Sequence, residues 1–296
     1  MKQLIRAITL LALFFTGAAA ADHDQAVNRT IEASADGEVR IENVSGTITV
    51  EGWDREEVQV TGTLEEGVER LEVDDEDGYI KIKVKVRRSG RDKEADLLVK
   101  LPAASRVRIS GIRTDIDVSD VTGPLRLNAI SGDISVESRA ESFQLETVSG
   151  DIRVEGSDKE ARMTVESVSG EINVDDLDGE ITGGTVSGDL GVRGGSVKRA
   201  NLDTTSGDLT FATEIVEDGV YDFEAVNGDI TLVTRGEPDA RFDITSFNGE
   251  INNDYGPDPE RVSEYGPGVE LQFTSGSGDA EVRINTLNGE IYLDER

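Results

Sequence analysis

A four-residue motif recurs along this chain at nearly constant spacing: Ser or Asn, then Gly, then Asp or Glu, then Ile or Leu. It begins at Ser131, Ser149, Ser169, Ser187, Ser206, Asn227, Asn248 and Asn288. Successive starts are 18, 20, 18, 19, 21, 21 and 40 residues apart, and the last interval is close to two units. One unit of this length cannot bury its own apolar face, so neighbouring units must stack on one another. The repeat therefore predicts an all-β chain that folds as a β-solenoid.

Apolar residues recur at fixed places in each unit when its Ser or Asn is numbered zero. In one unit they are Leu145 at position −4, Val148 at −1, Ile152 at +3 and Val154 at +5, and Gly183 is an exception at −4 in another. Alternating apolar and polar residues are typical of a strand with one buried face. Each unit is thus predicted to be a strand, a sharp corner at the glycine, a second strand and a variable return. We expect equivalent positions to stack as aliphatic rows through the interior of a right-handed parallel β-helix or β-roll.

The chain before the regular repeats also alternates, but less evenly. Residues 41–50 and 109–118 fit the repeat, the second without its glycine. Between them, residues 58–64, 71–73, 80–86 and 97–101 are predicted to form longer antiparallel strands that begin and cap the body. The expected organisation is a β-strand region over 22–105 that continues into a repeat solenoid over 106–296. Prolines within residues 252–268 predict an irregular loop that replaces one coil.

The first 21 residues have the composition of a secretory signal peptide. Lys2 and Arg6 form a short basic region, residues 8–15 are mainly apolar, and residues 18–21 are all alanine. The apolar run is too short to span a bilayer, and polar residues follow it at once. We therefore expect an exported chain, periplasmic or extracellular, with no membrane span in its mature form. Because it has no cysteine, core packing and backbone ladders must hold it together without disulfides.

The mature chain is strongly acidic. The whole sequence has a formal charge of −31, and removal of Lys2 and Arg6 leaves 28 basic against 61 acidic residues, or −33. Such a charge repels phosphate backbones and attracts cations or cationic peptides. Nucleic acid is therefore excluded as an expected partner.

Several segments together resemble a known family. They are the repeats themselves, the opening at residues 44–53, the segment at 97–102 and the final motif at 288–291. In order and number these segments resemble the bacterial putative-adhesin family of β-strand-repeat domains, a domain of unknown function. The resemblance implies an exported envelope protein with a β-helical or β-roll body, and no catalytic residues. Some relatives act in envelope-stress responses, including the sensing of cationic antimicrobial peptides.

Catalytic constellations are not apparent in the sequence. His23 is the only histidine, and it lies close to the expected cleavage site, so neither a Ser-His-Asp triad nor a histidine zinc site is expected. Acidic residues repeat in every coil and do not gather at one place, which argues against an enzyme and against a resident cofactor. The alternative to a non-enzymatic protein is a polysaccharide-active β-helix enzyme that uses clustered carboxylates. Its groove, or a simple binding loop, would lie near Tyr255 and Tyr265.

The acidic residue at position +2 is expected to form a row along the solenoid. Its members are Asp133, Asp151, Glu171, Asp189, Asp208, Asp229 and Glu250. Unit charges about 4.8 Å apart repel by roughly 1 kcal/mol in water. The repulsion could be relieved if each carboxylate accepted backbone N–H bonds at its own turn. It could also be relieved if the row bound Ca²⁺, although the Gly-Gly-x-Gly-x-Asp pattern of calcium β-rolls is missing.

These observations predict a non-enzymatic, exported, adhesin-like β-solenoid that serves as a binding or scaffolding surface at the cell envelope. The expected partner is an envelope protein, a glycan or a cationic peptide, and an envelope-stress sensor that binds cationic peptides is one form of this hypothesis. Self-association is also expected to be possible, because the ends of a solenoid expose strand edges.

Overall fold

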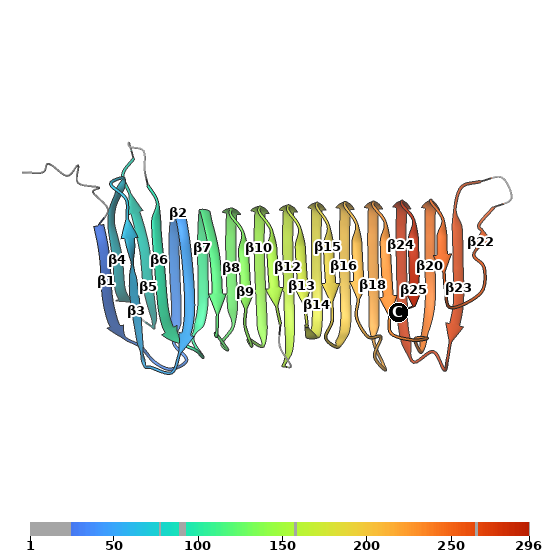
Figure 1. Cartoon of the computed structure of the whole chain (residues 1–296), viewed down its shortest axis with the longest axis horizontal. Coiled ribbons are helices and arrows are strands. Elements are labelled where there is room, and N and C mark those ends of the chain that lie inside the picture. Colours follow the sequence, from blue (N-terminus) through green and yellow to red (C-terminus); the bar gives the residue numbers. More distant parts are fainter. Residues whose placement is uncertain (1–24, 77, 89–92, 157–158, 264–265, 296) are drawn as a thin grey trace, which may run out of the picture.

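The computed structural model of the chain describes residues 25–76, 78–88, 93–156, 159–263 and 266–295. Over these residues the chain forms 25 strands and no helix, and the strands run side by side along an elongated body (Figure 1). Most strand pairs in the body are parallel. The predicted all-β solenoid is therefore confirmed. The expected signal peptide and His23 lie outside the described residues.

Each regular coil contributes one longer and one shorter strand, which pair with the same strands of the next coil. The first row holds the longer strands: β8 (Leu125–Ser131), β10 (Ser142–Ser149), β12 (Glu160–Ser169), β14 (Asp178–Ser187), β16 (Val197–Ser206), β18 (Val220–Asn227), β20 (Ala240–Asn248) and β24 (Ala280–Asn288). The second row holds the shorter strands: β9 (Ile134–Glu137), β11 (Ile152–Glu155), β13 (Ile172–Asp175), β15 (Leu190–Arg193), β17 (Leu209–Ala212), β19 (Ile230–Thr234), β21 (Ile251–Asn253) and β25 (Ile291–Glu295). We call one strand of each row, joined at the motif, a rung.

The motif glycine forms the corner between the two strands of a rung. Gly150 has a φ of +145°, and a Cβ atom built on it would lie 2.2 Å from the carbonyl oxygen of Gly132 in the preceding rung. A side chain at this position would meet backbone that cannot move aside. Glycine is therefore required so that successive corners can stack closely.

The core lies between the two rows of strands. Leu145 at position −4, Ile152 at +3 and Val154 at +5 are almost fully buried, as their equivalents are in other rungs. Gly183 interrupts the row at position −4 without leaving a void. A Cβ atom on it would lie 2.9 Å from Cγ1 of Val165 and 3.3 Å from Cδ2 of Leu202, so the neighbouring rungs already fill its place.

The N-terminal end combines parallel and antiparallel pairs. β2 (Glu38–Trp53) and β7 (Arg106–Ser119) each span both rows and pair in parallel over most of their length. β5 (Tyr79–Val86) and β6 (Ala95–Pro102) pair with the other side of β2, also in parallel. β3 (Glu57–Leu64), β4 (Val68–Glu76) and β1 (Gln25–Glu32) then add antiparallel strands outside them. The four segments expected to be antiparallel do pair in that way, β3 with β6 and β4 with β5, but β5 and β6 also pair in parallel with β2.

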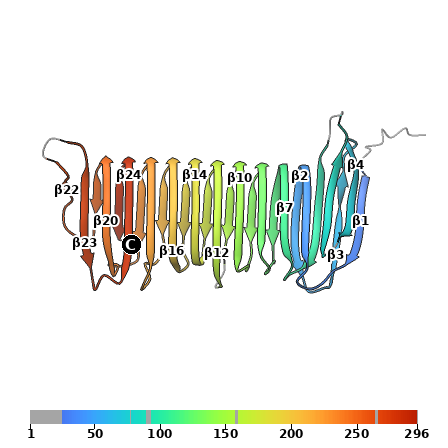
Figure 2. The same ribbon diagram turned by 180° about the vertical axis from the view of Figure 1, so that it is seen from behind.

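The rungs do not stack in sequence order at the C-terminal end. β24 and β25 pair on one side with β18 and β19, and on the other side with β20 and β21, so the last rung lies inside the body (Figures 1 and 2). Beyond β20 lie the antiparallel β23 (Val269–Ser275) and β22 (Glu260–Arg261). The described residues of 252–268 form an irregular excursion and no rung of their own, while the position of the last rung between the two preceding ones was not expected. This segment contains β22 and leads to β23, which lies beyond β20. The chain then turns back, and β24 and β25 form the rung between that of β18 and β19 and that of β20 and β21.

Candidate functional site

The residue at position −1 of each rung lies on the outer surface and not in the core. We call these residues the apolar column; in spatial order they are Val44, Ile112, Ile130, Val148, Val168, Val186, Thr205, Val226, Leu287 and Phe247. Eight of them are large hydrophobic residues with exposed fractions between 41% and 54%. The expectation that this position stacks through the interior is therefore wrong. In a strand, residues an odd number apart point to opposite faces, and position −1 is three residues from the buried position −4.

A groove of about 910 Å³ runs beside the apolar column. Its lining begins at Lys83 and Val84 of β5 and then extends over seven consecutive strands, from β2 through β7, β8, β10, β12 and β14 to β16. At the spacing of parallel strands this distance is about 29 Å. Small residues at position −2, such as Gly111, Ala129 and Ser167, line it between the apolar column and the residues at position −3. The groove is thus a consequence of the repeat, because equivalent small residues stack along the axis.

The wall opposite the apolar column is rich in carboxylates. At position −3 it contains Glu146, Glu166 and Asp203. Beyond the groove, Glu224 occupies the same position on the next strand, β18. Asn128 donates a hydrogen bond from Nδ2 to Oε2 of Glu146 at 2.7 Å. Partial burial raises the pKa of the Asp203 carboxyl. This wall therefore presents negative charge beside an apolar stripe.

The predicted acidic row is present, and two runs of hydrogen bonds, from Asp115 to Glu171 and from Asp189 to Glu290, form a ladder along it. Oδ1 of Asp133 accepts the backbone N–H of Asp151 at 2.8 Å, and Oδ1 of Asp151 accepts that of Glu171 at 3.0 Å. The N–H donor comes from the next rung and not from the residue's own turn, where we expected it. Two members were missed. Asp115 begins the ladder, and Glu290 lies between Asp229 and Glu250 because of the inserted rung.

No metal site is apparent in the part of the chain that the structure describes, since it holds no group of three or more His, Cys, Asp or Glu side chains placed to bind an ion. One oxygen of each bonded Asp in the ladder is already engaged with backbone. Binding of Ca²⁺ by the row stays an untested alternative hypothesis.

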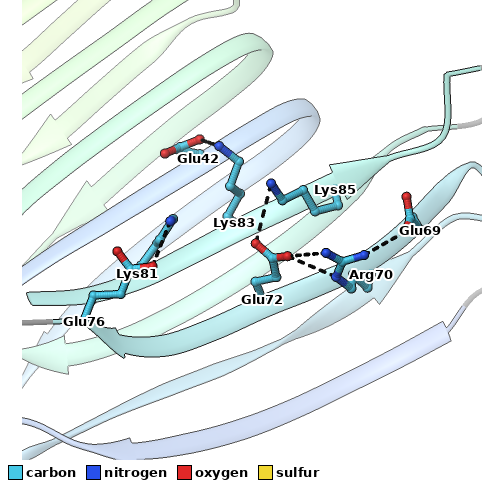
Figure 3. Close-up of polar contacts among 8 residues, drawn as sticks. All are labelled: Glu42, Glu69, Arg70, Glu72, Glu76, Lys81, Lys83 and Lys85. Atoms are coloured by element: carbon cyan, nitrogen blue, oxygen red, sulfur yellow. Dashed lines mark hydrogen bonds and ion pairs between the residues drawn. The ribbon is translucent and has the colours of Figure 1, made fainter.

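The N-terminal end of the outer face carries the main cluster of paired cations. Figure 3 shows Lys81, Lys83 and Lys85 of β5 directed toward Glu76, Glu42 and Glu72, respectively. Nearby, the Glu38 carboxylate accepts a hydrogen bond from Arg40 and lies 3.1 Å from Nε of Arg108. Burial raises the pKa of Glu38, but the bond to Arg40 and the charge of Arg108 outweigh burial and hold the pKa below its usual value. These cations neutralise local acids, among them Glu42 at the end of the groove formed by β2 and β5.

The predicted binding loop is only partly described. Tyr255 is half-buried, and its hydroxyl lies 2.6 Å from Oγ1 of Thr234 and donates to the carbonyl oxygen of Asp294. Burial raises the pKa of this phenol. Tyr265 lies outside the described residues. Tyr255 therefore fastens its loop to β19 and β25, and its hydroxyl is engaged within the protein.

Sequence reasoning missed the groove, although the signal was present. Val148 comes three positions after Leu145 and four positions before Ile152, and the glycine corner lies between Val148 and Ile152. Strict application of the two-residue period from Leu145 to Val148 would have placed Val148 on the outer face.

Within the residues that the structure describes, no helix has the length and apolar character needed to cross a membrane.

Comparisons with known proteins find a matching family model and several similar solved structures. The sequence model of the family described as Toastrack DUF4097 matches residues 53–294. A search of curated proteins finds no match. Among solved structures, a putative adhesin from Bacteroides fragilis is 11% identical, with a TM-score of 0.45 and coverage of 91% of this chain and 97% of that one. A putative adhesin from Parabacteroides merdae is 14% identical, with a TM-score of 0.33 and coverage of 91% and 96%. A putative lipid binding protein from Parabacteroides distasonis is 12% identical, with a TM-score of 0.33 and coverage of 90% and 96%.

Proposed function

This chain belongs to the Toastrack DUF4097 family, and from that premise and the groove we propose that it is a non-enzymatic, exported, adhesin-like binding surface. It works in the periplasm or outside the cell, where the proposed signal peptide at residues 1–21 directs it. Its ligands are partly apolar, cationic polypeptide segments that lie along the groove. It needs no resident cofactor for this role.

The observation that supports this proposal most directly is the apolar column with acids on both sides. On one side lie the carboxylates at position −3, such as Glu146 and Glu166, and on the other side lies the acidic row at position +2. Single exposed hydrophobic residues are ordinary, but a long contiguous stripe of them marks an interaction surface. A ligand gains most here if it carries apolar side chains for the column and basic side chains for the flanking acids.

Electrostatics favour the same ligand at longer range. The formal charge of −31 attracts cations from solution and raises their rate of encounter with the groove. The lining contains no Trp, Tyr or Phe among its described residues, so it offers no stacking platform for a sugar ring. A cationic peptide or a basic segment of an envelope protein therefore fits better than a glycan.

Association of copies through the strand edges at either end is a separate prediction, which light scattering over a range of concentrations tests.

A polysaccharide-active enzyme receives less support. Its expected groove would lie beside Tyr255, whose hydroxyl is already bonded to Thr234 and to the carbonyl of Asp294. Incubation of the purified chain with acidic glycans tests this alternative. Release of reducing ends or of unsaturated products would favour the enzyme over the binding surface.

The binding proposal is tested with the mature chain, residues 22–296, and a synthetic amphipathic peptide of leucine and lysine. A leucine and glutamate peptide of equal length is the ligand control. We expect titration calorimetry to give saturable binding of the lysine peptide alone. The double variant Val148→Asn/Val168→Asn should weaken binding about tenfold or more, because it removes two half-exposed apolar contacts. Ser135→Asn, on the exposed face of β9, is the matched control and should bind normally. Equal binding of both peptides, or of all variants, would contradict the proposal.

A further inference from the structure

Asp203 differs from the other carboxylates of the groove in its surroundings. It lies on β16 at position −3, where the groove ends, and the residue at the same position of the preceding strand β14 is Gly184. A Cβ atom built on Gly184 would lie 2.8 Å from Oδ2 and 3.0 Å from Oδ1 of Asp203. The carboxylate therefore occupies the hollow left by the absent side chain. Because residue 184 is glycine, the side chain of Asp203 can lie against β14.

The position of Asp203 has a cost that no contact within the described residues offsets. Asp203 is an exposed residue, but the hollow over Gly184 shields one side of its carboxylate from water, and this partial desolvation raises the pKa. No Lys or Arg side chain among the described residues lies within 4.0 Å of it, whereas Arg162 and Arg199 on the neighbouring strands approach Glu180. A partly desolvated anion without a partner is unfavourable, and an incoming cation would remove that penalty.

The apolar column also changes at this rung. Thr205, two residues after Asp203, is the one member of the column that is not a large hydrophobic residue. On the N-terminal side the column offers Ile130, Val148 and Val186 in an unbroken stripe. A ligand whose apolar side chains fill this stripe would place its next group beside Asp203 and Thr205. That place suits a polar, positively charged group.

We propose that Asp203, positioned by the hollow over Gly184, forms the subsite that binds one primary ammonium or guanidinium group of the ligand. This inference rests on the proposed function, since it assigns the charged end of the groove to one carboxylate. The apolar column supplies most of the contact area, and Asp203 sets the register in which a lysine or arginine side chain is accepted. The bound cation donates to the carboxylate and restores the solvation that the hollow removes.

The test is a double-mutant cycle between the protein and a peptide probe. The probe is an amphipathic leucine and glutamine peptide of about nine residues, which spans about 29 Å when extended, with one lysine at one end. The comparison probe carries glutamine in place of that lysine. We expect Asp203→Asn to weaken the lysine probe about tenfold or more and to leave the glutamine probe unchanged, because a charge-assisted hydrogen bond is lost only with lysine.

Two further variants separate this subsite from general attraction by an acidic surface. Glu224→Gln removes the same charge at position −3 of the next strand, β18, outside the groove. At about 4.8 Å from Asp203 this charge is only partly screened, so its loss should weaken the lysine probe about two- to threefold, clearly less than Asp203→Asn does. Gly184→Ala should weaken the lysine probe as Asp203→Asn does, because the new Cβ displaces the carboxylate.

The outcomes are distinguishable. If Asp203→Asn and Glu224→Gln have equal effects, or if both probes respond alike to Asp203→Asn, the subsite is wrong while binding in the groove stands. If the wild-type chain binds the leucine and lysine peptide but neither probe, the subsite is wrong and the proposed function stands, whereas failure to bind any of the three peptides overturns both. Circular dichroism of each variant establishes that the fold is retained.

Discussion

Oδ1 of Asp189 accepts the backbone N–H of Asp208 in the next rung at 2.8 Å. The same contact recurs from Asp208 to Asp229 and from Asp229 to Glu290. Each of these Asp carboxylates thus compensates for repulsion by its neighbours with a charge-assisted bond to backbone. The row of acids is therefore a structural element of the corner, whatever else it binds.

The ladder predicts different effects for two substitutions of Asp189. Asp189→Asn keeps an oxygen that can accept the N–H of Asp208 and removes one repelling charge, so stability should be unchanged or slightly higher. Asp189→Ala removes the acceptor and should lower the free energy of unfolding by about 1 kcal/mol. Urea denaturation of both variants measures this difference. Equal destabilisation by alanine and asparagine would show that charge, and not the acceptor, matters.

The same ladder bears on calcium. Because Oδ1 of the bonded Asp residues is engaged, one oxygen per residue is left, and Ca²⁺ takes six to eight oxygen ligands. We expect no saturable heat of binding and no shift in melting temperature at millimolar Ca²⁺. Titration calorimetry and thermal melting of the mature chain, with Mg²⁺ as the matched control, test this. A melting shift specific to Ca²⁺ would support a cation row.

Much of the fold follows from periodicity that the sequence displays openly. The spacing from Ser149 to Ser169 and onward predicts stacked rungs, because no single unit can enclose its own apolar face. The order of the last rungs could not be predicted. Ile244 and Ile284, with the residues around them, give β20 and β24 nearly the same buried pattern, so either strand fits either place. Chain reversal through β23 decides the order, and local patterning does not encode it.

The candidate site was predictable only in part. The acidic row follows from the motif, which also contains Glu290 at position +2 of its last copy, and only the place of Glu290 between Asp229 and Glu250 depends on the fold. The groove depends on which face Val148 occupies, and the period of the strand could have settled that question. The relation between Asp203 and Gly184 could not have been found, because it requires knowing that β14 and β16 are neighbours at that register.

Substitution of a corner glycine should be severely destabilising. Gly150→Ala would place a Cβ atom 2.2 Å from a backbone oxygen, at a φ that L-residues rarely adopt. We expect a loss of about 3 kcal/mol or more in the free energy of unfolding, or no folded protein. Gly236→Ala is the control, because it has a positive φ of 73° but no atom within 4 Å of the new Cβ. If both variants lose the same stability, backbone strain alone explains the effect and close stacking does not.

The buried phenol of Tyr221 gives a sharper test of core hydrogen bonding. Its hydroxyl donates to the carbonyl oxygen of Val197 at 2.7 Å and accepts the backbone N–H of Val216 at 3.0 Å. Tyr221→Phe leaves both backbone groups without this partner and should cost about 1–3 kcal/mol in urea denaturation. Tyr292→Phe is the matched control, since that hydroxyl bonds only to the Glu290 side chain near the surface, a contact that raises the pKa of Tyr292 to about 12. If Tyr221→Phe leaves the free energy of unfolding unchanged, other groups or water must form hydrogen bonds to the carbonyl of Val197 and the N–H of Val216.

The loop that begins the inserted rung should depend on pH through Asp239. The carboxylate accepts hydrogen bonds from Oγ of Ser277 at 2.8 Å and from the N–H groups of Gly278 and Asp279 at 2.6 and 3.2 Å. The bond from Ser277, with these backbone bonds, lowers the pKa of Asp239. Since the folded pKa lies below the unfolded value of about 3.9, the stabilisation is fully present above about pH 4. It is lost as the pH falls through the folded pKa.

Amide exchange of Gly278 and Asp279 measures this dependence locally. We expect their protection factors to fall on acidification below about pH 4. In Asp239→Asn they should be lower already at neutral pH and should not fall further, because the amide cannot gain the charge that strengthens these bonds. Protection at Ile244, deep in β20, is the internal control and should stay high in both proteins. An acid response that persists unchanged in Asp239→Asn would assign the pH dependence to another carboxylate, and the inserted rung would then owe its anchoring to packing alone.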